Sequence, residues 1–222
     1  MKPTLVIANR NYSSWSMRPW VLLRELGIEF DEVQLKFESD AWRREIARWS
    51  PTGLVPVLML DGEPIWDSLA IVEVVAERFP GARVWPRDAR ARAHARTICA
   101  EMHAGFRALR AAMPMNIRGS HPGKGVTPES RRDIDRILAI WTGCRERHGS
   151  GGELLFGSFT AADAYFAPVV MRFATYAVEL PPVARAYADA VQALPAVREW
   201  CEAACAETEF YAEDEPYTER PA

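Results

Sequence analysis

One stretch of the chain decides the fold: SPTGLVPVLMLDGEPIWDS, residues 50–68. It contains an apolar run, Val55 to Leu60, and the proline in this run suits a strand edge and a cis Val55-Pro56 bond. Asp61-Gly62 is a strong hairpin signal that joins the run to a second strand. Asp67-Ser68 then begins a helical pattern. The stretch therefore predicts a strand-strand-helix unit.

The residues before this stretch complete a small α/β unit. Strand-like apolar runs at residues 5–8 and 30–35 alternate with helical patterns at residues 20–26 and 41–49. Together with the strand-strand-helix unit they give residues 1–80 the predicted order β-α-β-α-β-β-α. This alternation is typical of an α/β domain.

The first helix has recognisable ends. Gly27 is a normal C-terminal signal. Because proline suits a helix best where its missing N–H has no partner, Pro19 places the start only a few residues earlier, beside Ser13 and Ser14. The serine pair is therefore predicted to lie where a strand turns into a helix.

After a linker at residues 81–88 the pattern becomes helical. Five apolar residues recur at the spacing of one buried helix face: Ile98, Met102, Phe106, Leu109 and Met113. Four local signals open further helices: Thr127-Pro128, the capping box Thr160 to Asp163, Pro182 and Pro195. We expect residues 89–222 to form an all-α domain whose acidic tail, from Glu207 onward, wraps the surface or is partly disordered.

The bulk composition restricts the function. A chain of 222 residues with 49% hydrophobic residues, 26% charged residues and a net charge of −3 offers no general attraction for nucleic acid or an anionic membrane. The sequence shows neither the apolar core of a signal peptide nor a membrane-length apolar run, so a cytoplasmic location is expected. The 4 cysteines and 4 histidines show no zinc-ligand spacing, so we expect no metal and buried, inert thiols.

Three features would meet at one edge of the predicted sheet. The Ser13-Ser14 turn sits at a helix start, whose free N–H groups can stabilise an anion. The Val55 backbone beside Pro56 is open to pairing with a peptide-like ligand. Asp67-Ser68 can hold an ammonium group and a carboxylate. Taken singly, helix capping explains the serines and Asp67, but the joint occurrence favours a binding site.

The motifs in this order resemble those of the cytosolic glutathione transferases. Residues 13–16 are similar to the Ser-Ser-Cys-Ser turn of zeta-type members, and residues 50–58 to Asn-Pro-x-Gly-x-Val-Pro-x-Leu. Residues 67–71 look like Glu/Asp-Ser-x-Ala-Ile, and residues 155–163 resemble the capping box before the family's central buried helix. The resemblance covers nearly the whole chain. It implies a thioredoxin-like N-terminal domain followed by an all-α helical C-terminal domain.

The resemblance also implies a glutathione site. Asp67 and Ser68 would hold the γ-glutamyl end of glutathione, and the Val55 backbone beside cis-Pro56 would pair with its cysteinyl part. Leu54, also expected at this site, replaces a residue that is often polar in the family, so one side-chain contact would be lost.

A serine would face the sulfur as a hydrogen-bond donor. Its hydroxyl is too weak an acid to act as the base for a thiol of pKa about 8.5, but a hydrogen bond to the thiolate lowers that pKa. Alignment on the zeta-type turn selects Ser13, whereas counting back from Arg18, as in theta-like members, selects Ser14. Ser13 is slightly preferred.

The electrophile pocket is expected between the domains. Its candidate lining residues are Trp15, His103, Phe106, Met113 and Met115. For Phe106 and Met113 the shared helix face favours core packing instead. Arginines at 107, 110 and 118 could assist an anionic substrate, although solvated helix charges are the ordinary interpretation.

The resemblance implies a homodimeric transferase that conjugates glutathione to small hydrophobic electrophiles. One alternative is a glutathione-dependent isomerase or lyase with a single substrate. Another is a non-catalytic binding or regulatory protein of the same fold. Trp15 stands where zeta-type members have cysteine, which argues against maleylacetoacetate isomerase activity and places an indole against the ligand.

Overall fold

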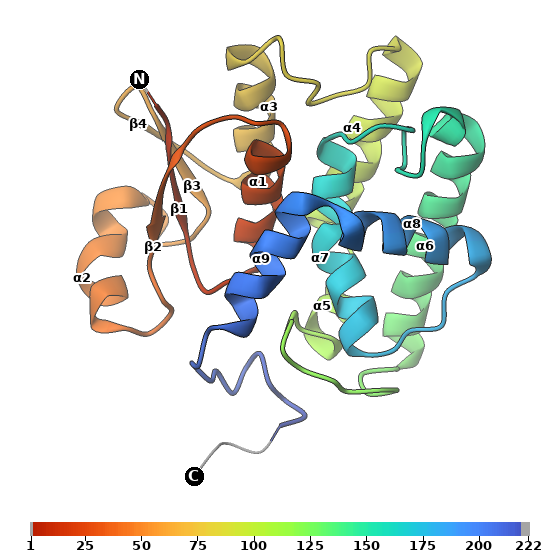
Figure 1. Cartoon of the computed structure of the whole chain (residues 1–222). Coiled ribbons are helices and arrows are strands. Elements are labelled where there is room, and N and C mark those ends of the chain that lie inside the picture. The colour runs from red at the N-terminus through yellow and green to blue at the C-terminus, as the bar shows by residue number, and fades with distance from the viewer. Residues whose placement is uncertain (1, 219–222) are drawn as a thin grey trace.

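The computed structural model describes residues 2–218 and has the predicted two-part architecture (Figure 1). The first part consists of β1 (Thr4–Ile7), α1 (Ser14–Glu25), β2 (Asp31–Gln34), α2 (Asp40–Trp49), β3 (Val57–Leu60), β4 (Glu63–Ile65) and α3 (Ser68–Arg78). The second part consists of α4 (Ala89–Ala104), α5 (Arg107–Ala112), α6 (Pro128–His148), the short 3-10 helix η1 (Gly149–Gly151), α7 (Ala161–Thr175), α8 (Pro182–Ala193) and α9 (Pro195–Cys205). The predicted element order and fold class are confirmed.

The four strands form one mixed sheet in the order β2-β1-β3-β4. Strand β1 pairs parallel to β2 and antiparallel to β3, with Leu5 opposite Leu58 and Val6 opposite Val57. Because successive side chains of a strand point to opposite faces, Leu5 and Leu58 join the main core whereas Val6 and Val57 pack with residues of α2. Helices therefore cover both faces of the sheet.

Local turn signals fix the ends of these elements. Asp61 and Gly62 both have positive φ, +52° and +90°, as a two-residue hairpin turn between β3 and β4 requires. Gly27 has φ +67° and ends α1, where the Ile28 N–H donates to the Leu23 carbonyl across the helix end at 2.9 Å. The predicted hairpin and helix stop are confirmed.

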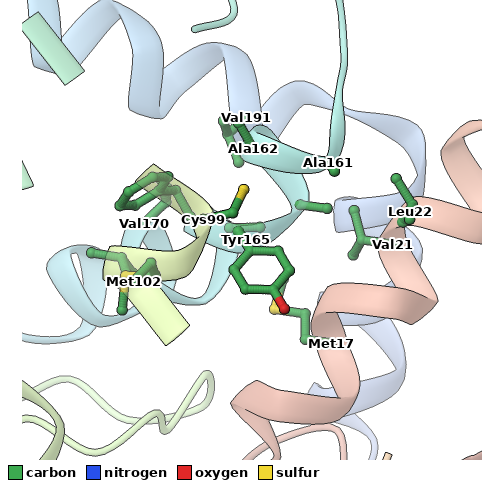
Figure 2. Packing of buried hydrophobic residues seen from close by; sticks show 14 of the residues in the cluster. Met17, Val21, Leu22, Cys99, Met102, Ala161, Ala162, Tyr165, Val170 and Val191 are labelled. Atoms are coloured by element: carbon green, nitrogen blue, oxygen red, sulfur yellow. The ribbon is translucent and has the colours of Figure 1, made fainter. Parts of the chain in front are cut away.

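The two parts share one hydrophobic core. Helix α7 is buried along almost its entire length, with α1 from the first part on one side and α4 and α8 from the second part around it. Figure 2 shows Met17, Val21 and Leu22 of α1 facing Ala161 and Tyr165 of α7. The boundary between the parts is therefore packed like an interior.

The start of α7 is held by the predicted capping box. The Asp163 carboxylate accepts hydrogen bonds from the N–H of Thr160 at 2.9 Å and the N–H of Leu155 at 3.1 Å. Asp163 is fully buried, and burial raises its pKa to about 6. A carboxylate in this place ties the loop before α7 to the helix itself.

The predicted helix face from Ile98 to Met113 does not belong to one helix. Helix α4 ends at Ala104, and Phe106 has a left-handed φ of +60° before α5 begins. A Cβ on Gly105 would lie 2.8 Å from the Glu101 carbonyl oxygen, so only glycine fits this close passage. The chain turns here because Phe106 is drawn into the core, where it is 7% exposed.

The remaining helix starts follow their local signals. Thr127 caps α6, with proline at its first position, and Pro182 and Pro195 open α8 and α9. Beyond α9, residues 207–218 contain no helix or strand and lie along the molecule (Figure 1). The last four residues of the predicted acidic tail, 219–222, lie outside the described residues.

We predict that Asp163→Ala destabilises the protein by about 3 kcal/mol or more. The substitution leaves buried N–H donors at Thr160 and Leu155 without acceptors, at about 1–3 kcal/mol each. Urea unfolding measures the loss, with Asp189→Ala on the exposed face of α8 as the control, expected within about 0.5 kcal/mol of wild type. Equal stabilities for the two variants would contradict the structural role of the box.

Candidate functional site

A cavity of about 550 Å³ lies where the two parts of the chain meet. It is lined by Trp15, Thr52, Leu54, Val55, Pro56, Trp66, Asp67, Ser68 and His103. Most of these residues come from the loops before β3 and α3, whereas His103 comes from α4. The sheet edge and one helix of the second part thus frame a single space.

The peptide edge predicted at Val55 borders this cavity. The Val55-Pro56 bond is cis, and the paired residues of β1 and β3 begin only at Val57. The Val55 backbone therefore precedes the strand ladder and is placed beside the cavity. Leu54, next to it, is 67% exposed, so an apolar side chain forms the rim there.

Asp67 has two roles at the start of α3. One carboxylate oxygen accepts the Leu69 N–H at 3.1 Å and caps the helix, as expected for this residue type. The other oxygen lies 3.2 Å from Nε2 of His103 on α4. The Asp67 carboxylate therefore lines the cavity while one of its oxygens is paired with His103 of the other domain.

Ser68 is held from the opposite domain. Its side chain is fully buried, and its hydroxyl lies 3.0 Å from the Tyr165 hydroxyl of α7. Besides this hydroxyl, Ser68 has a second group that suits an anionic ligand, its backbone N–H in the first turn of α3. That turn also carries the positive end of the helix dipole.

The hydroxyl of Ser13 is engaged within its own turn. Ser13 is the N-cap of α1 and accepts the Ser16 N–H at 3.4 Å. Its own proton goes to the Ser16 Oγ at 2.8 Å. The Ser13 proton is therefore committed within the turn that starts the helix, which begins beside the serine pair as predicted.

Ser14 has a different partner. Its Oγ accepts a hydrogen bond from the Arg172 guanidinium of α7 at 3.4 Å. Arg172 is 6% exposed, and burial lowers its pKa to about 10. The acceptor side of Ser14 thus faces a buried positive charge, while its hydroxyl proton is free to point elsewhere.

Two more arginines surround the next residue, Trp15. The Arg18 guanidinium lies 4.1 Å from the Trp15 ring centroid and that of Arg110 lies 4.6 Å from it, both within cation–π range. Arg18 is 1% exposed, and burial, followed by the charge of Arg110, lowers its pKa to about 9. Within residues 2–218 neither these two nor Arg172 forms an ion pair with a carboxylate. The region beside the serine turn is therefore positively charged and largely dry.

The other predicted pocket residues lie in different places. His103 lines the cavity and packs edge-on against Trp15, with ring centroids 5.2 Å apart. Phe106, Met113 and Met115 belong to the main core instead, as the helix-face spacing favoured for the first two. Ser13 and Ser14 directly precede the cavity residue Trp15 in the chain, but each is only 5% exposed and neither lines the cavity.

The three arginines that could assist an anionic substrate lie in different places. Arg110 lies beside Trp15, and Arg107 is exposed on α5. Arg118 donates to backbone carbonyls of the C-terminal segment, including that of Glu209 at 2.6 Å. Only Arg110 is therefore near the cavity.

No local signal in the chain identifies Arg172 as a partner of the serine turn or Tyr165 as a partner of Ser68. Both lie on the buried helix α7, and their partners are 158 and 97 positions away. Trp66 and Thr52 line the cavity beside residues that were predicted. Trp66 directly precedes Asp67 and Thr52 lies two residues before Leu54, and this closeness in the chain is the signal that could have identified them.

The cysteines do not form a site in the described part of the chain. Cys99 and Cys144 are buried, and burial raises the pKa of the Cys144 thiol to about 12. Cys205 is exposed, contrary to the expectation of buried thiols, because it lies on the outer face of the last turn of α9. No group of three metal-ligating side chains occurs within residues 2–218, and no described helix is long and apolar enough to cross a membrane.

Both parts of the chain match models of known protein families. Residues 12–78 match the model of the glutathione S-transferase N-terminal domain, and residues 88–203 match that of the C-terminal domain. Together the two matches cover both sides of the cavity.

Individual relatives fit the same pattern. The maleylacetoacetate isomerase of Rattus norvegicus is 28% identical over 189 residues, which is 82% of each chain. A probable maleylacetoacetate isomerase of Caenorhabditis elegans is 32% identical over 108 residues. This match covers 49% of this chain and 50% of the length of that relative. A glutathione transferase homologue from Burkholderia, crystallised with bound glutathione, has a similar fold, with a TM-score of 0.70, 23% identity and coverage of 91% of this chain and 97% of the homologue.

Proposed function

The chain belongs to the glutathione S-transferase family, and from this premise we propose that it binds glutathione in the 550 Å³ cavity and activates the thiol as a thiolate. In this proposal residues 1–80 form the glutathione-binding domain, residues 81–88 the linker and residues 89–222 the domain that completes the electrophile pocket. The observation that carries it is that all five expected glutathione-binding residues line this one cavity: Leu54, Val55, Pro56, Asp67 and Ser68.

The ends of glutathione match the charges around the cavity. The Asp67 carboxylate suits the γ-glutamyl ammonium group, and the N–H of Ser68 at the start of α3 suits the neighbouring carboxylate. Since Asp67 already pairs with His103 at 3.2 Å, the ammonium group competes with that imidazole or shares the carboxylate with it. The Val55 backbone offers strand-like pairing to the cysteinyl part.

The hydrogen-bond partners of the two serine hydroxyls favour Ser14 as the donor to the thiolate, whereas the sequence slightly favoured Ser13. The Ser13 proton is directed to Ser16, whereas Ser14 accepts from Arg172 and keeps its proton. A cation on the acceptor side of a hydroxyl strengthens that hydroxyl as a donor. Trp15 lines the cavity, whereas Ser14 is 5% exposed and does not, so contact between Ser14 and the sulfur requires a local rearrangement of the turn.

The reaction is attack of the thiolate on an electrophilic carbon: a C–S bond forms while the bond to a leaving group breaks and that group departs with the electron pair. Lowering a thiol pKa of about 8.5 by roughly two units corresponds to about 2.7 kcal/mol and makes the thiolate the main species at neutral pH. The positive charges of Arg18, Arg110 and Arg172 favour the anion. Trp15, Trp66 and Leu54 supply apolar walls suited to a small hydrophobic electrophile. As in the family, the working unit in this proposal is a homodimer.

We predict that Ser14→Ala raises the pKa of the bound glutathione thiol by roughly one unit or more, because the thiolate loses a hydrogen-bond donor. Titration calorimetry establishes binding, and ultraviolet absorbance of the thiolate across pH gives its pKa. Ser13→Ala is the matched variant and is expected to act mainly on stability, by about 1 kcal/mol through loss of the helix cap. No saturable binding by the wild type would remove the proposed function, and an unchanged thiol pKa in Ser14→Ala would remove the serine assignment.

We predict that Asp67→Asn weakens glutathione binding by about tenfold, the effect of losing a partly exposed ion pair with the ammonium group. Asparagine is also a good N-cap, so the stability of α3 is retained. A glutathione analogue without the γ-glutamyl amino group is the control ligand, and both proteins should bind it equally. A similar loss of affinity for the analogue would contradict the assigned contact.

A dedicated glutathione-dependent isomerase is the second candidate, because the rat relative that matches over 82% of each chain carries that name. Trp15 in place of the zeta-type cysteine favours conjugation instead. We predict measurable conjugation with a panel of small apolar electrophiles and slow cis-trans isomerisation of maleylacetoacetate. Rapid isomerisation with no turnover of the panel would decide for the isomerase.

A further inference from the structure

The backbone before the serine turn is held by a side chain from the other end of the chain. Glu207 follows α9 and is 9% exposed. One oxygen of its carboxylate accepts the Arg10 N–H at 2.8 Å, and the other accepts the Asn11 N–H at 3.0 Å. The first oxygen also accepts from the Gln34 amide at 2.7 Å. A single carboxylate thus bridges two successive backbone amides and β2.

The next residue is held by the same C-terminal segment. The Tyr12 hydroxyl lies 2.8 Å from the Glu209 carbonyl oxygen and also hydrogen-bonds the Glu215 carboxylate. Burial, then the contact with Glu215, raises the pKa of Tyr12 to about 12, so the phenol stays a donor. Arg118 donates to the Tyr12 hydroxyl at 2.8 Å and to the carbonyl oxygen of Glu207. Residues 207–215 therefore contact the loop between β1 and α1 at consecutive positions.

These contacts reach the serines through short backbone hydrogen bonds. The Ser13 N–H donates to the Asn9 carbonyl at 2.8 Å, and the Ser14 N–H donates to the Tyr12 carbonyl at 2.8 Å. The Trp200 indole of α9 donates to the Arg10 carbonyl at 3.0 Å. Other elements hold the side chains of Asn9 and Asn11, whereas the backbone N–H groups of Arg10 and Asn11 are held by Glu207. The backbone just before the serines therefore depends on the C-terminal segment.

We propose that Glu207 is a positioning residue for the thiolate donor: its carboxylate fixes the loop that leads into Ser14, the first residue of α1. This inference rests on the proposed function and adds to it a role for the acidic C-terminal segment. Glutamate suits the place because both oxygens accept, whereas a glutamine would turn its NH₂ group toward one of the two backbone N–H groups. Charge-assisted bonds of this kind are the stronger class.

The test compares Glu207→Gln with Glu199→Gln in the full chain. Glu199 lies on α9 itself, and its carboxylate pairs with Arg24 at the surface, where the Glu199 side chain is 49% exposed. Amide hydrogen exchange followed by nuclear magnetic resonance should show exchange at Arg10 and Asn11 at least tenfold faster in Glu207→Gln, with no change in Glu199→Gln. This readout does not involve glutathione.

The second readout uses bound glutathione. In Glu207→Gln we expect the thiol pKa to rise by about one unit and kcat for conjugation to fall about tenfold at neutral pH. The KM for glutathione should stay within about twofold, because Val55, Asp67 and Ser68 lie on other segments that Glu207 does not contact. Glu199→Gln should match the wild type in all three quantities.

The outcomes separate the two proposals. If wild-type protein does not bind glutathione, the proposed function fails regardless of the exchange data. If Glu207→Gln loosens the loop but leaves the thiol pKa and kcat unchanged, Glu207 only stabilises the fold and the inference is wrong. If Glu207→Gln does not fold, Tyr12→Phe, which loses the hydroxyl contacts to Glu209, Glu215 and Arg118, should shift the thiol pKa in the same direction. An unchanged value in Tyr12→Phe overturns the inference.

Discussion

Helix α7 has no polar face, and other elements must therefore cover it on every side. Helix α1, from the sheet domain, supplies one side of that cover, with Met17, Val21 and Leu22 packed against it (Figure 2). The same helix starts at the serine turn and so cannot move relative to α7 without opening the core. Burial of one apolar helix thus fixes the distance between the two domains, and with it the cavity at their junction.

This packing also places charges where water is scarce. Arg172 on α7 and Arg18 on α1 are both buried, and their depressed pKa values, about 10 and about 9, reflect the cost of removing a cation from water. Such a cost is offset when an anion lies nearby. In the proposed function the glutathione thiolate is that anion, and Ser14 connects it to Arg172. The cationic region is then part of the chemistry as well as of the core.

Much of the fold could be predicted because its signals act over a few residues. Gly27, the Asp61-Gly62 turn and Pro195 each determine the backbone at or next to their own position. The prediction of one helix from Ile98 to Met113 was wrong for a reason outside that pattern. Phe106 keeps the apolar spacing, but its left-handed φ breaks the helix, and the core that receives its ring is assembled from distant elements.

At the candidate site, local signals in the chain predict which residue types gather at the sheet edge: the serine turn, Val55 before its cis proline, and the Asp67 cap of α3. Which of their atoms remain available depends on the packing of distant elements. Ser14 meets Arg172 across 158 positions, and Glu207 meets Asn11 across 196. Capping and turn signals act within about four residues along the chain, whereas these hydrogen bonds exist only after α1, α7 and the C-terminal segment have packed together.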